Sequence, residues 1–242
     1  MTASAREVQA VALARLLAGE RTVAVGNSSP LPAAAALLGR VLSGGAMRVM
    51  ILGSRRHGGF TDGGCELFDA AAQGRIDAFF LSGGQIDGEG NLNLVGVGEY
   101  PRLDRRFPGS FGSAYLYFLV PKVLLFREEH SPRVLVQRVD FVSAPASSAP
   151  GVYRRGGPAA LVTGRCVFRF DRERRRFALE SVHPGETLES VQANTGFEFD
   201  AGDAPPITPA PTPRELALLR GEIAGELADV YPRLGRELRS AR

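Results

Sequence analysis

Short apolar runs alternate with helical patterns over the first part of the chain. The apolar runs cover residues 22–25, 48–52 and 77–81, and each has the length of a buried strand. Apolar side chains gather mostly on one helical face at residues 6–18, and Ser4 is a suitable N-cap there. Residues 31–42 are rich in Ala and Leu and are predicted to form a second helix, and residues 65–73 a third. Strands that alternate with helices are typical of a mostly parallel sheet with helices on both faces. The pattern therefore predicts an α/β fold.

The second half of the chain is dominated by β-like runs. These runs cover residues 120–126, 134–141, 160–163, 166–170 and 177–182. A connection rich in Pro, Ser and Gly occupies residues 144–157, and short helices are predicted to begin at Ala114 and to cover residues 186–193. We therefore expect residues 1–202 to form one domain whose second half is rich in β-structure.

The C-terminal end divides into a proline-rich part and a helical part. Residues 203–213 contain five prolines and are predicted to form a semi-rigid tether. Residues 214–242 are predicted to form a C-terminal helix with an apolar stripe made of Leu216, Leu219, Ile223, Leu227 and Val230. The stripe is suited to packing on this chain or on a partner, and the pattern leaves both open.

Two glycine-rich turns are the main candidates for chemistry. The first, Ser-Gly-Gly-Gln-Ile-Asp-Gly-Glu-Gly-Asn-Leu-Asn, occupies residues 82–93 directly after an apolar run, where the backbone must turn or approach a ligand closely. The second, Phe-Pro-Gly-Ser-Phe-Gly, occupies residues 107–112 before the predicted helix at Ala114. Unpaired N–H groups at such a helix start suit a phosphate, a carboxylate or an oxyanion. Ordinary turn chemistry is the competing explanation for the same residues.

Composition excludes some classes of protein. A hydrophobic content of 44% over 242 residues is enough for a sizeable core and excludes a chain that is disordered throughout. The net charge is only +3, and the basic residues are scattered arginines apart from Lys122. No basic stripe interleaved with aromatic residues is present, so we expect no nucleic-acid partner.

Cysteine and histidine give no metal-binding spacing. The two cysteines, Cys65 and Cys166, are far apart, and His57, His130 and His183 have no Cys or His partner at helical spacing. His130 is expected in an exposed loop and His183 at a turn. No signal peptide or long apolar span is recognisable, so we expect a soluble, cytoplasmic protein that does not bind a membrane.

Several motifs in order resemble those of the β subunit of class I CoA-transferases, most closely the glutaconate CoA-transferase branch. They are the 82–93 stretch, the 107–112 turn, Val-Asp-Phe-Val-Ser at 139–143, Ser-Val-His-Pro-Gly at 181–185, Thr-Leu at 187–188 and Asn-Thr-Gly-Phe at 194–197. The resemblance extends from about Val8 to Phe199. It implies a Rossmann-like three-layer CoA-transferase fold and a homologous α subunit, in a heterodimer or heterotetramer. It also implies a site between the subunits that takes a coenzyme A thioester as substrate, without a permanently bound cofactor.

The chain departs from the family at the position of the nucleophile. Much of the family carries a glutamate just after a strand, and this glutamate attacks the thioester to form an anhydride and then an enzyme-CoA thioester. The matching position follows Leu52 and holds Gly53 or Ser54. The nearest downstream carboxylates are Asp62, which needs a remodelled loop, and Glu66, at the start of a predicted helix.

The missing glutamate leaves several reactions open. The resemblance implies that relatives on this scaffold hydrolyse a carbon–carbon bond or ring in an acyl-CoA, or decarboxylate an unsaturated diacyl-CoA, without this glutamate. We expect one of these non-transferase reactions. The alternatives are a true CoA-transferase with a displaced carboxylate, and a non-catalytic scaffold for an α-subunit enzyme.

The candidate acyl-CoA-binding residues come from four loops. They are Asn27, Ser28, Arg55, Arg56, Gly83, Gly84, Gln85, Gly109, Ser110 and Gly112. The glycines are candidates for an oxyanion-binding wall, Gln85 for contact with the acyl group, and the two arginines for contact with a carboxylate or a CoA phosphate. Turns, a loop cap and a solvated basic loop are the competing structural explanations.

Two further sets of residues have local interpretations. Ser54 is a candidate nucleophile, but the sequence shows no oriented His and acid partner for it. Asp87, Asn91 and Asn93 are predicted to fix the backbone of the first glycine turn.

Overall fold

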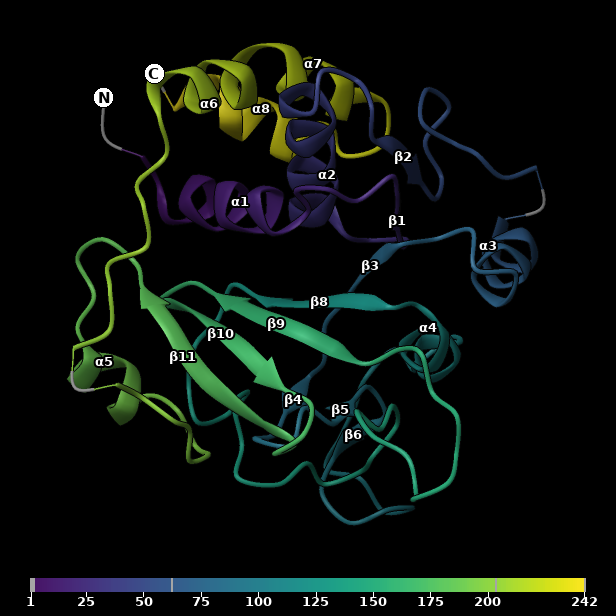
Figure 1. Cartoon of the computed structure of the whole chain (residues 1–242), viewed down its shortest axis with the longest axis vertical. Helices are drawn as coiled ribbons and strands as arrows, with labels where there is room; N and C mark the ends of the chain where they lie inside the picture. Colours follow the sequence, from purple (N-terminus) through teal and green to yellow (C-terminus); the bar gives the residue numbers. More distant parts are fainter. Residues whose placement is uncertain (1–2, 62, 203, 242) are drawn as a thin grey trace. The chain divides into compact units, whose positions relative to one another are not determined.

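The computed structural model describes residues 3–61, 63–202 and 204–241 (Figure 1). The chain forms two compact units, one made of residues 1–80 and 209–242 and the other of residues 81–208. The first unit thus combines the two ends of the chain, whereas the second is a continuous segment.

Parallel strands form the centre of the first unit. β1 (Thr22–Val25) pairs in parallel with β2 (Arg48–Ile51) on one side and with β3 (Ala78–Leu81) on the other. These strands consist almost entirely of buried apolar residues, which is typical of parallel strands covered on both faces. The three strands predicted for this part of the chain are confirmed.

The helices of the first half also follow the prediction. They are α1 (Ala5–Leu16), α2 (Pro30–Leu42) and α3 (Gly63–Ala72). Ser4 caps α1 as expected, because its hydroxyl accepts a hydrogen bond from the Glu7 N–H while the Glu7 carboxylate accepts one from the Ser4 N–H. In Figure 1, α1 and α2 pack against each other in the first unit.

The C-terminal part of the first unit contains two helical stretches. α6 (Pro213–Leu218), η1 (Leu219–Ile223), α7 (Ala224–Glu226) and η2 (Leu227–Asp229) follow one another without a break, and α8 (Pro232–Ser240) comes after a gap. The sequence pattern predicted a single helix here. The interruption falls at Tyr231, because a residue directly before a proline is disfavoured in helical conformation.

The C-terminal helices dock on this chain, which settles the alternative left open by the sequence. Leu219, Ile223 and Leu227 of the apolar stripe are fully buried. The Arg220 guanidinium of η1 contacts both carboxylate oxygens of buried Glu7 in α1, at 2.6 and 3.0 Å. Burial alone would raise the pKa of Glu7, but hydrogen bonds from Arg220 and Ser4 lower it on balance.

A mixed sheet forms the main body of the second unit. β8 (Lys122–Arg127) runs parallel to β9 (Pro158–Thr163), and β10 (Cys166–Asp171) pairs antiparallel with both β9 and β11 (Arg176–Val182). The unit also contains α4 (Ser113–Leu119) and α5 (Leu188–Ala193). Two short hairpins complete it, formed by β4 (Gln85–Ile86) with β5 (Leu92–Asn93) and by β6 (Gly96–Val97) with β7 (Arg105–Arg106). The α/β class with a β-rich second half is confirmed.

The strand predicted at residues 134–141 is wrong. In this range only Leu135 makes a β-bridge, to Ile86. At this bridge the Val136 N–H donates to the Ile86 carbonyl, but Leu135 itself donates to the Ser131 carbonyl in a turn, and Val139 donates to the Asp87 carboxylate. The apolar alternation reflects side chains buried from an irregular segment, because no continuous partner strand takes up its hydrogen bonds.

The proline-rich tether predicted at residues 203–213 has no helix or strand in residues 204–212, while Asp203 lies outside the described residues. Ile207 makes an isolated bridge to Val182 of β11. Among the described residues, no helix is both long and apolar enough to cross a bilayer.

Candidate functional site

The loop after β2 is the place where the sequence lacks the expected carboxylate. Gly53 adopts φ +85°, a left-handed conformation in which a side chain would be strained, and Ser54 is buried. The Ser54 hydroxyl donates to the Asp229 carboxylate at 2.9 Å and accepts a hydrogen bond from the His57 N–H at 2.9 Å. The hydroxyl is therefore engaged in holding the loop.

The same Asp229 oxygen collects two further donors. The backbone N–H groups of Arg55 and Arg56 lie 3.0 and 3.2 Å from Oδ2. Burial would raise the pKa of Asp229, but the hydrogen bonds from Ser54, Arg56 and Arg55 lower it on balance, so the carboxylate is charged at neutral pH. The side chains of Arg55 and Arg56 are exposed.

Other side chains of the C-terminal segment contact the neighbouring loops. Glu226 lies 2.7 Å from Nε2 of His57 and 3.8 Å from the Arg40 guanidinium. The Tyr231 hydroxyl accepts a hydrogen bond from the Ser29 N–H at 3.0 Å, and burial raises the pKa of Tyr231. We call residues 226–231 the C-terminal brace, because they hold the loops after β1 and β2.

The loop after β1 turns at Asn27 and Ser28. Ser28 adopts φ +55°, and its N–H donates to the Asn27 side-chain oxygen at 2.9 Å. Both side chains are exposed. The Asn27 oxygen thus bonds to the N–H of the next residue and not to the N–H two positions on, as it would in an Asx turn, and contact of these residues with a substrate stays a prediction.

The first glycine turn, in the second unit, is held by its own side chains. The Asp87 carboxylate accepts hydrogen bonds from the N–H groups of Glu89 and Asn91, at 3.2 and 2.9 Å. The Asn93 side-chain oxygen accepts from the N–H groups of Val95 and Gly96. The predicted role in fixing the turn backbone is confirmed for Asp87 and Asn93, whereas the Asn91 side-chain oxygen accepts from the Ala146 N–H outside the turn. Burial raises the pKa of Asp87, which is only 3% exposed.

Gln85 belongs to this network. It is buried, and its side-chain oxygen accepts hydrogen bonds from the Asn93 amide at 2.7 Å and from the Asp140 N–H at 3.0 Å. The oxygen thus has two donors within the second unit, so contact with an acyl group would involve the amide nitrogen or a rearrangement.

The two glycine turns lie against each other. A side chain at Gly84 would overlap the ring of Phe107, and one at Gly83 would come too close to the Gln85 carbonyl. The Gly109 N–H donates to the Leu94 carbonyl at 3.0 Å, which joins the second turn to the end of the first. The structure therefore brings Gly83, Gly84 and Gly109 into one region.

The second turn has the strained backbone that glycine accommodates. Gly109 and Gly112 adopt φ +103° and +73°, and Gly112 is the N-cap residue of α4. The Ser110 carbonyl accepts a hydrogen bond from the Ser113 N–H at 2.8 Å. The predicted helix start at Ala114 is confirmed within one residue.

A cavity of about 290 Å³ opens in the second unit beside the first glycine turn. Its lining residues are Ser82, Phe126, Arg127, Glu128 and Glu129. The Glu129 carboxylate contacts the Ser131 hydroxyl and the Arg133 guanidinium. Both contacts lower the pKa of Glu129, and the hydrogen bond from Ser131 has the larger effect. The cavity places charged groups next to Ser82.

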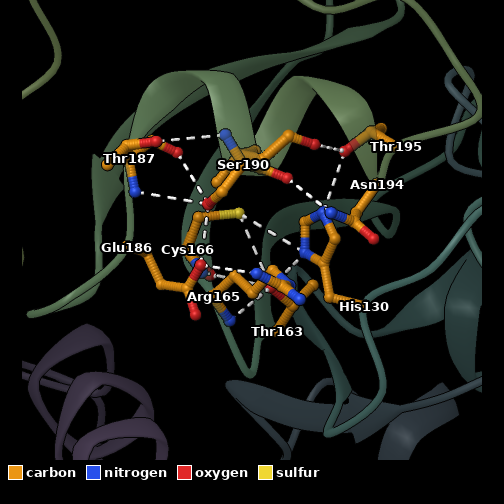
Figure 2. A network of polar contacts seen from close by, with 10 residues as sticks. His130, Thr163, Arg165, Cys166, Glu186, Thr187, Ser190, Asn194 and Thr195 are labelled. Atoms are coloured by element: carbon orange, nitrogen blue, oxygen red, sulfur yellow. Dashed lines mark hydrogen bonds and ion pairs between the residues drawn. The ribbon is translucent and has the colours of Figure 1, made fainter.

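His130 follows this cavity wall and is buried, so the prediction of an exposed loop is wrong. Its ring nitrogens lie 2.7 Å from the Thr163 hydroxyl and 2.9 Å from the Thr195 hydroxyl, and these partners make burial of the imidazole possible (Figure 2). Burial lowers the pKa of His130 to about 4. The ring is therefore neutral at pH 7.

Cys166 lies 3.8 Å from His130 in the same network, which Figure 2 shows between the turn joining β9 to β10 and α5. Burial raises the pKa of Cys166 to about 12. A neutral thiol beside a neutral imidazole is the opposite of an activated Cys–His pair.

His183 is also buried and hydrogen-bonded, directly before the predicted turn. Among the described residues, no cluster of three or more His, Cys, Asp or Glu side chains is suited to a metal ion.

Sequence reasoning missed the acidic residues of the brace. Asp229 is separated from Ser54 by 175 positions, and no local motif links the two. Both lie in the first unit, whereas the glycine turns lie in the second. The available signal was weak: Asp229 and Glu226 are polar residues within a helix whose apolar stripe already predicted docking. Asp62, the carboxylate considered from the sequence, lies outside the described residues.

The model of the family described as Coenzyme A transferase matches residues 9–194, and the chain belongs to this family. The chain is similar to the B subunit of 3-oxoadipate CoA-transferase from Pseudomonas knackmussii, with 32% identity over 61% of this chain and 58% of the relative. It is also similar to the B subunit of glutaconate CoA-transferase from Acidaminococcus fermentans, with 31% identity over 60% of this chain and 56% of the relative. The cholesterol ring-cleaving hydrolase IpdB subunit from Rhodococcus jostii is 32% identical over 64% of this chain and 62% of the relative. The matched region thus spans less than two thirds of each of these relatives.

Solved structures share the fold over most of the chain. The crystal structure of glutaconate coenzyme A-transferase from Acidaminococcus fermentans has a TM-score of 0.81 at 23% identity and covers 95% of this chain and 98% of that one. IpdAB from Rhodococcus jostii has a TM-score of 0.78 at 27% identity, covering 91% and 94%. The decarboxylase AibA/AibB has a TM-score of 0.76 at 23% identity, covering 94% and 99%. These matches confirm the CoA-transferase fold that the sequence resemblance implied.

Proposed function

We propose that this chain is the β subunit of a heteromeric enzyme that acts on an acyl-CoA thioester together with a homologous α subunit. The proposed chemistry is hydrolytic cleavage of a carbon–carbon bond or ring, or decarboxylation, rather than CoA exchange. Membership of the Coenzyme A transferase family supports the substrate class. Relatives named as a ring-cleaving hydrolase and as a decarboxylase support the reaction class.

The observation that carries this proposal is the loop after β2. The position matched to the nucleophile holds Gly53 or Ser54. The backbone conformation of Gly53 disfavours any side chain, and the Ser54 hydroxyl is hydrogen-bonded to Asp229. A glycine has no nucleophile, and this serine has no imidazole hydrogen-bonded to its hydroxyl among the described residues. The covalent step of CoA transfer therefore lacks its nucleophile within this loop.

The remaining contribution of the chain is to bind and orient the thioester. At Gly109 the space that a side chain would fill is open, so a ligand can approach the backbone there, whereas the Phe107 ring and the Gln85 carbonyl occupy this space at Gly84 and Gly83. The exposed guanidinium groups of Arg55 and Arg56 are suited to a carboxylate or a CoA phosphate. A base for hydrolysis or decarboxylation would come from the α subunit.

The proposal is tested on the native complex, isolated through an affinity tag on this chain. We expect a mixture of acyl-CoA thioesters to be consumed without any added carboxylic acid acceptor. Turnover that requires an acceptor acid and produces the CoA ester of that acid would contradict the proposal. A Ser110→Leu variant that assembles normally and keeps full turnover would support a non-catalytic scaffold instead.

One observation favours a second candidate, a CoA-transferase with a displaced carboxylate. Asp229 brings a charged carboxylate to the loop that lacks one, and Asp229 is exposed. In this alternative, an Asp229 oxygen attacks the thioester carbonyl and CoA thiolate leaves, giving an anhydride. The thiolate then attacks the Asp229 carbonyl, which releases the free acid and leaves an enzyme-CoA thioester.

A further inference from the structure

Three donors on consecutive residues converge on one oxygen of Asp229. They are the Ser54 hydroxyl and the N–H groups of Arg55 and Arg56, all within 3.2 Å of Oδ2. Consecutive donors that point at one position form a concave site that favours an anion. Among the described residues, Oδ1 of Asp229 has no hydrogen-bond donor.

The segment that carries Asp229 is itself fixed in the first unit. Arg220 binds buried Glu7 through two contacts, and Tyr231 accepts a hydrogen bond from Ser29 after β1. Val230 covers the loop directly, because a Cβ atom built at Gly53 would lie 4.0 Å from its side chain. The brace thus presents the Asp229 carboxylate from a well-anchored position.

We propose that Asp229 is a positioning residue that sets the conformation of residues 53–57, and so the way this loop presents Arg55 and Arg56 to an acyl-CoA. The effect of Asp229 on the loop conformation involves the first unit alone. The effect on acyl-CoA binding rests on the proposed function. Asp229 acts here through the loop, whereas in the alternative above it reacts with the substrate. The two roles have different requirements: positioning needs a hydrogen-bond acceptor, and the reaction needs a carboxylate.

Substitution by alanine and by asparagine separates these requirements. Asp229→Ala removes the acceptor, whereas Asp229→Asn keeps a side-chain oxygen of the same shape without the charge. Glu222→Gln is the matched control, because Glu222 is an exposed acidic residue of the same helical stretch and the loop donors go to Asp229 instead.

Amide hydrogen exchange in the full chain tests the positioning directly. We expect Asp229→Ala to accelerate exchange at the Arg55 and Arg56 N–H groups on the order of tenfold or more, because bonds to a charged acceptor are lost. Asp229→Asn restores most of the protection, and Glu222→Gln matches the wild type. Unchanged exchange in Asp229→Ala would overturn the inference, as would an equal acceleration throughout α1 and α8, which would indicate general loosening.

The effect of Asp229 on ligand binding is tested with coenzyme A as the probe. Binding to the wild type and to the Asp229→Ala, Asp229→Asn and Glu222→Gln variants is measured by calorimetry. We expect Asp229→Ala to weaken binding about tenfold and Asp229→Asn to stay within about threefold of the wild type. Equal losses in both variants, with the loop still protected in Asp229→Asn, would assign a role to the charge and overturn positioning. If the wild-type chain does not bind coenzyme A, the proposed function loses its support from this chain, while the exchange result still decides the role of Asp229.

Discussion

The loops of the first unit and the glycine turns of the second are held in place by different means. The hairpin of β4 and β5 is fixed by side chains within or next to it, because Asp87 and Asn93 bond to N–H groups two to four positions away. The loops after β1 and β2 depend on Tyr231 and Asp229, which are 202 and 175 positions away in sequence. The first glycine turn is therefore held partly by its own side chains, with further donors from Val139 and Asp140, whereas the loop after β2 depends on the docking of the C-terminal helices.

We therefore expect different constraints on the loops of the first unit and on the glycine turns of the second. The bonds that Asp87 and Asn93 accept from nearby N–H groups need no distant segment, although Val139 and Asp140 also donate to Asp87 and Gln85. The braced loops are sensitive to substitutions far away in α1 and η1, since these helices anchor the brace.

Loss of the buried ion pair should give the greatest destabilisation. Glu7→Ala removes the buried ion pair with Arg220 and the capping-box acceptor of the Ser4 N–H, and we expect the free energy of unfolding to fall by about 3–5 kcal/mol. Urea denaturation measures this change. The control is Glu237→Ala, which removes the exposed pairs of Glu237 with Arg6 and Arg233 and should cost less than about 1 kcal/mol. Similar losses in both variants would argue against a special role of the buried anchor.

The two units should respond to acid in different pH ranges. His130 of the second unit has a pKa lowered from 6.5 to about 4, so the unfolded state binds a proton first as the pH falls. Stability linked to His130 is therefore complete above pH 6.5 and decreases progressively down to pH 4, by about 3 kcal/mol. In the first unit, the pKa values of Glu7 and Asp229 are lowered. The stability linked to these carboxylates therefore decreases only when the pH falls below their ordinary pKa values of 4.5 and 3.8.

Denaturation of the wild type and His130→Gln between pH 7 and 4 measures this contribution. We expect the variant to be less stable at pH 7 but to lose less stability between pH 6.5 and 4.5. Parallel pH profiles for the two proteins would show that His130 does not determine the acid response.

Disruption of the local network should have an intermediate effect. Asn93→Ala removes four hydrogen bonds of a fully buried side chain, to Gln85, Val95 and Gly96, and we expect a loss of about 2–3 kcal/mol. Glu89→Ala on the exposed part of the same turn is the control and should be nearly neutral. Amide exchange should increase in residues 82–97 and stay unchanged at Arg55 and Arg56.

Removal of the Ser54 hydroxyl should have the mildest effect. Ser54→Ala loses one bond to Asp229 and one from the His57 N–H, but Arg55 and Arg56 still donate to the carboxylate. We expect a loss of about 1 kcal/mol in denaturation, with turnover by the native complex nearly unchanged. Complete loss of turnover with intact folding would instead support Ser54 as a nucleophile.

The sequence was most informative where structure depends on neighbouring residues. The runs that became β1 and β3 are short and apolar, and Ser4 with Glu7 forms a recognisable capping box. Asp87 and Asn93 were identified correctly because Asx side chains bond to backbone groups nearby.

Tertiary contacts explain the residues that sequence reasoning misplaced. His130 looked exposed because it lies among charged residues, but hydroxyls from Thr163 and Thr195 allow its burial. The apolar alternation around Leu135 was read as a strand, although its only β-type bonds among the described residues are to Ile86 and its other hydrogen bonds go to turns and side chains. The position of Asp229 beside Ser54 depends on docking between segments at opposite ends of the chain, which no spacing rule reveals.

The chain is proposed to handle an acyl-CoA without itself forming a covalent CoA intermediate. The most direct measurement is to incubate the native complex with acyl-CoA during turnover, reduce it with borohydride and analyse the peptides of this chain by mass spectrometry. We predict that the substrate is consumed and that the peptides containing Ser54 and Asp229 keep their unmodified masses. A reduced carboxylate at Asp229, or an acyl group on Ser54, formed at a rate that matches turnover would contradict this proposal.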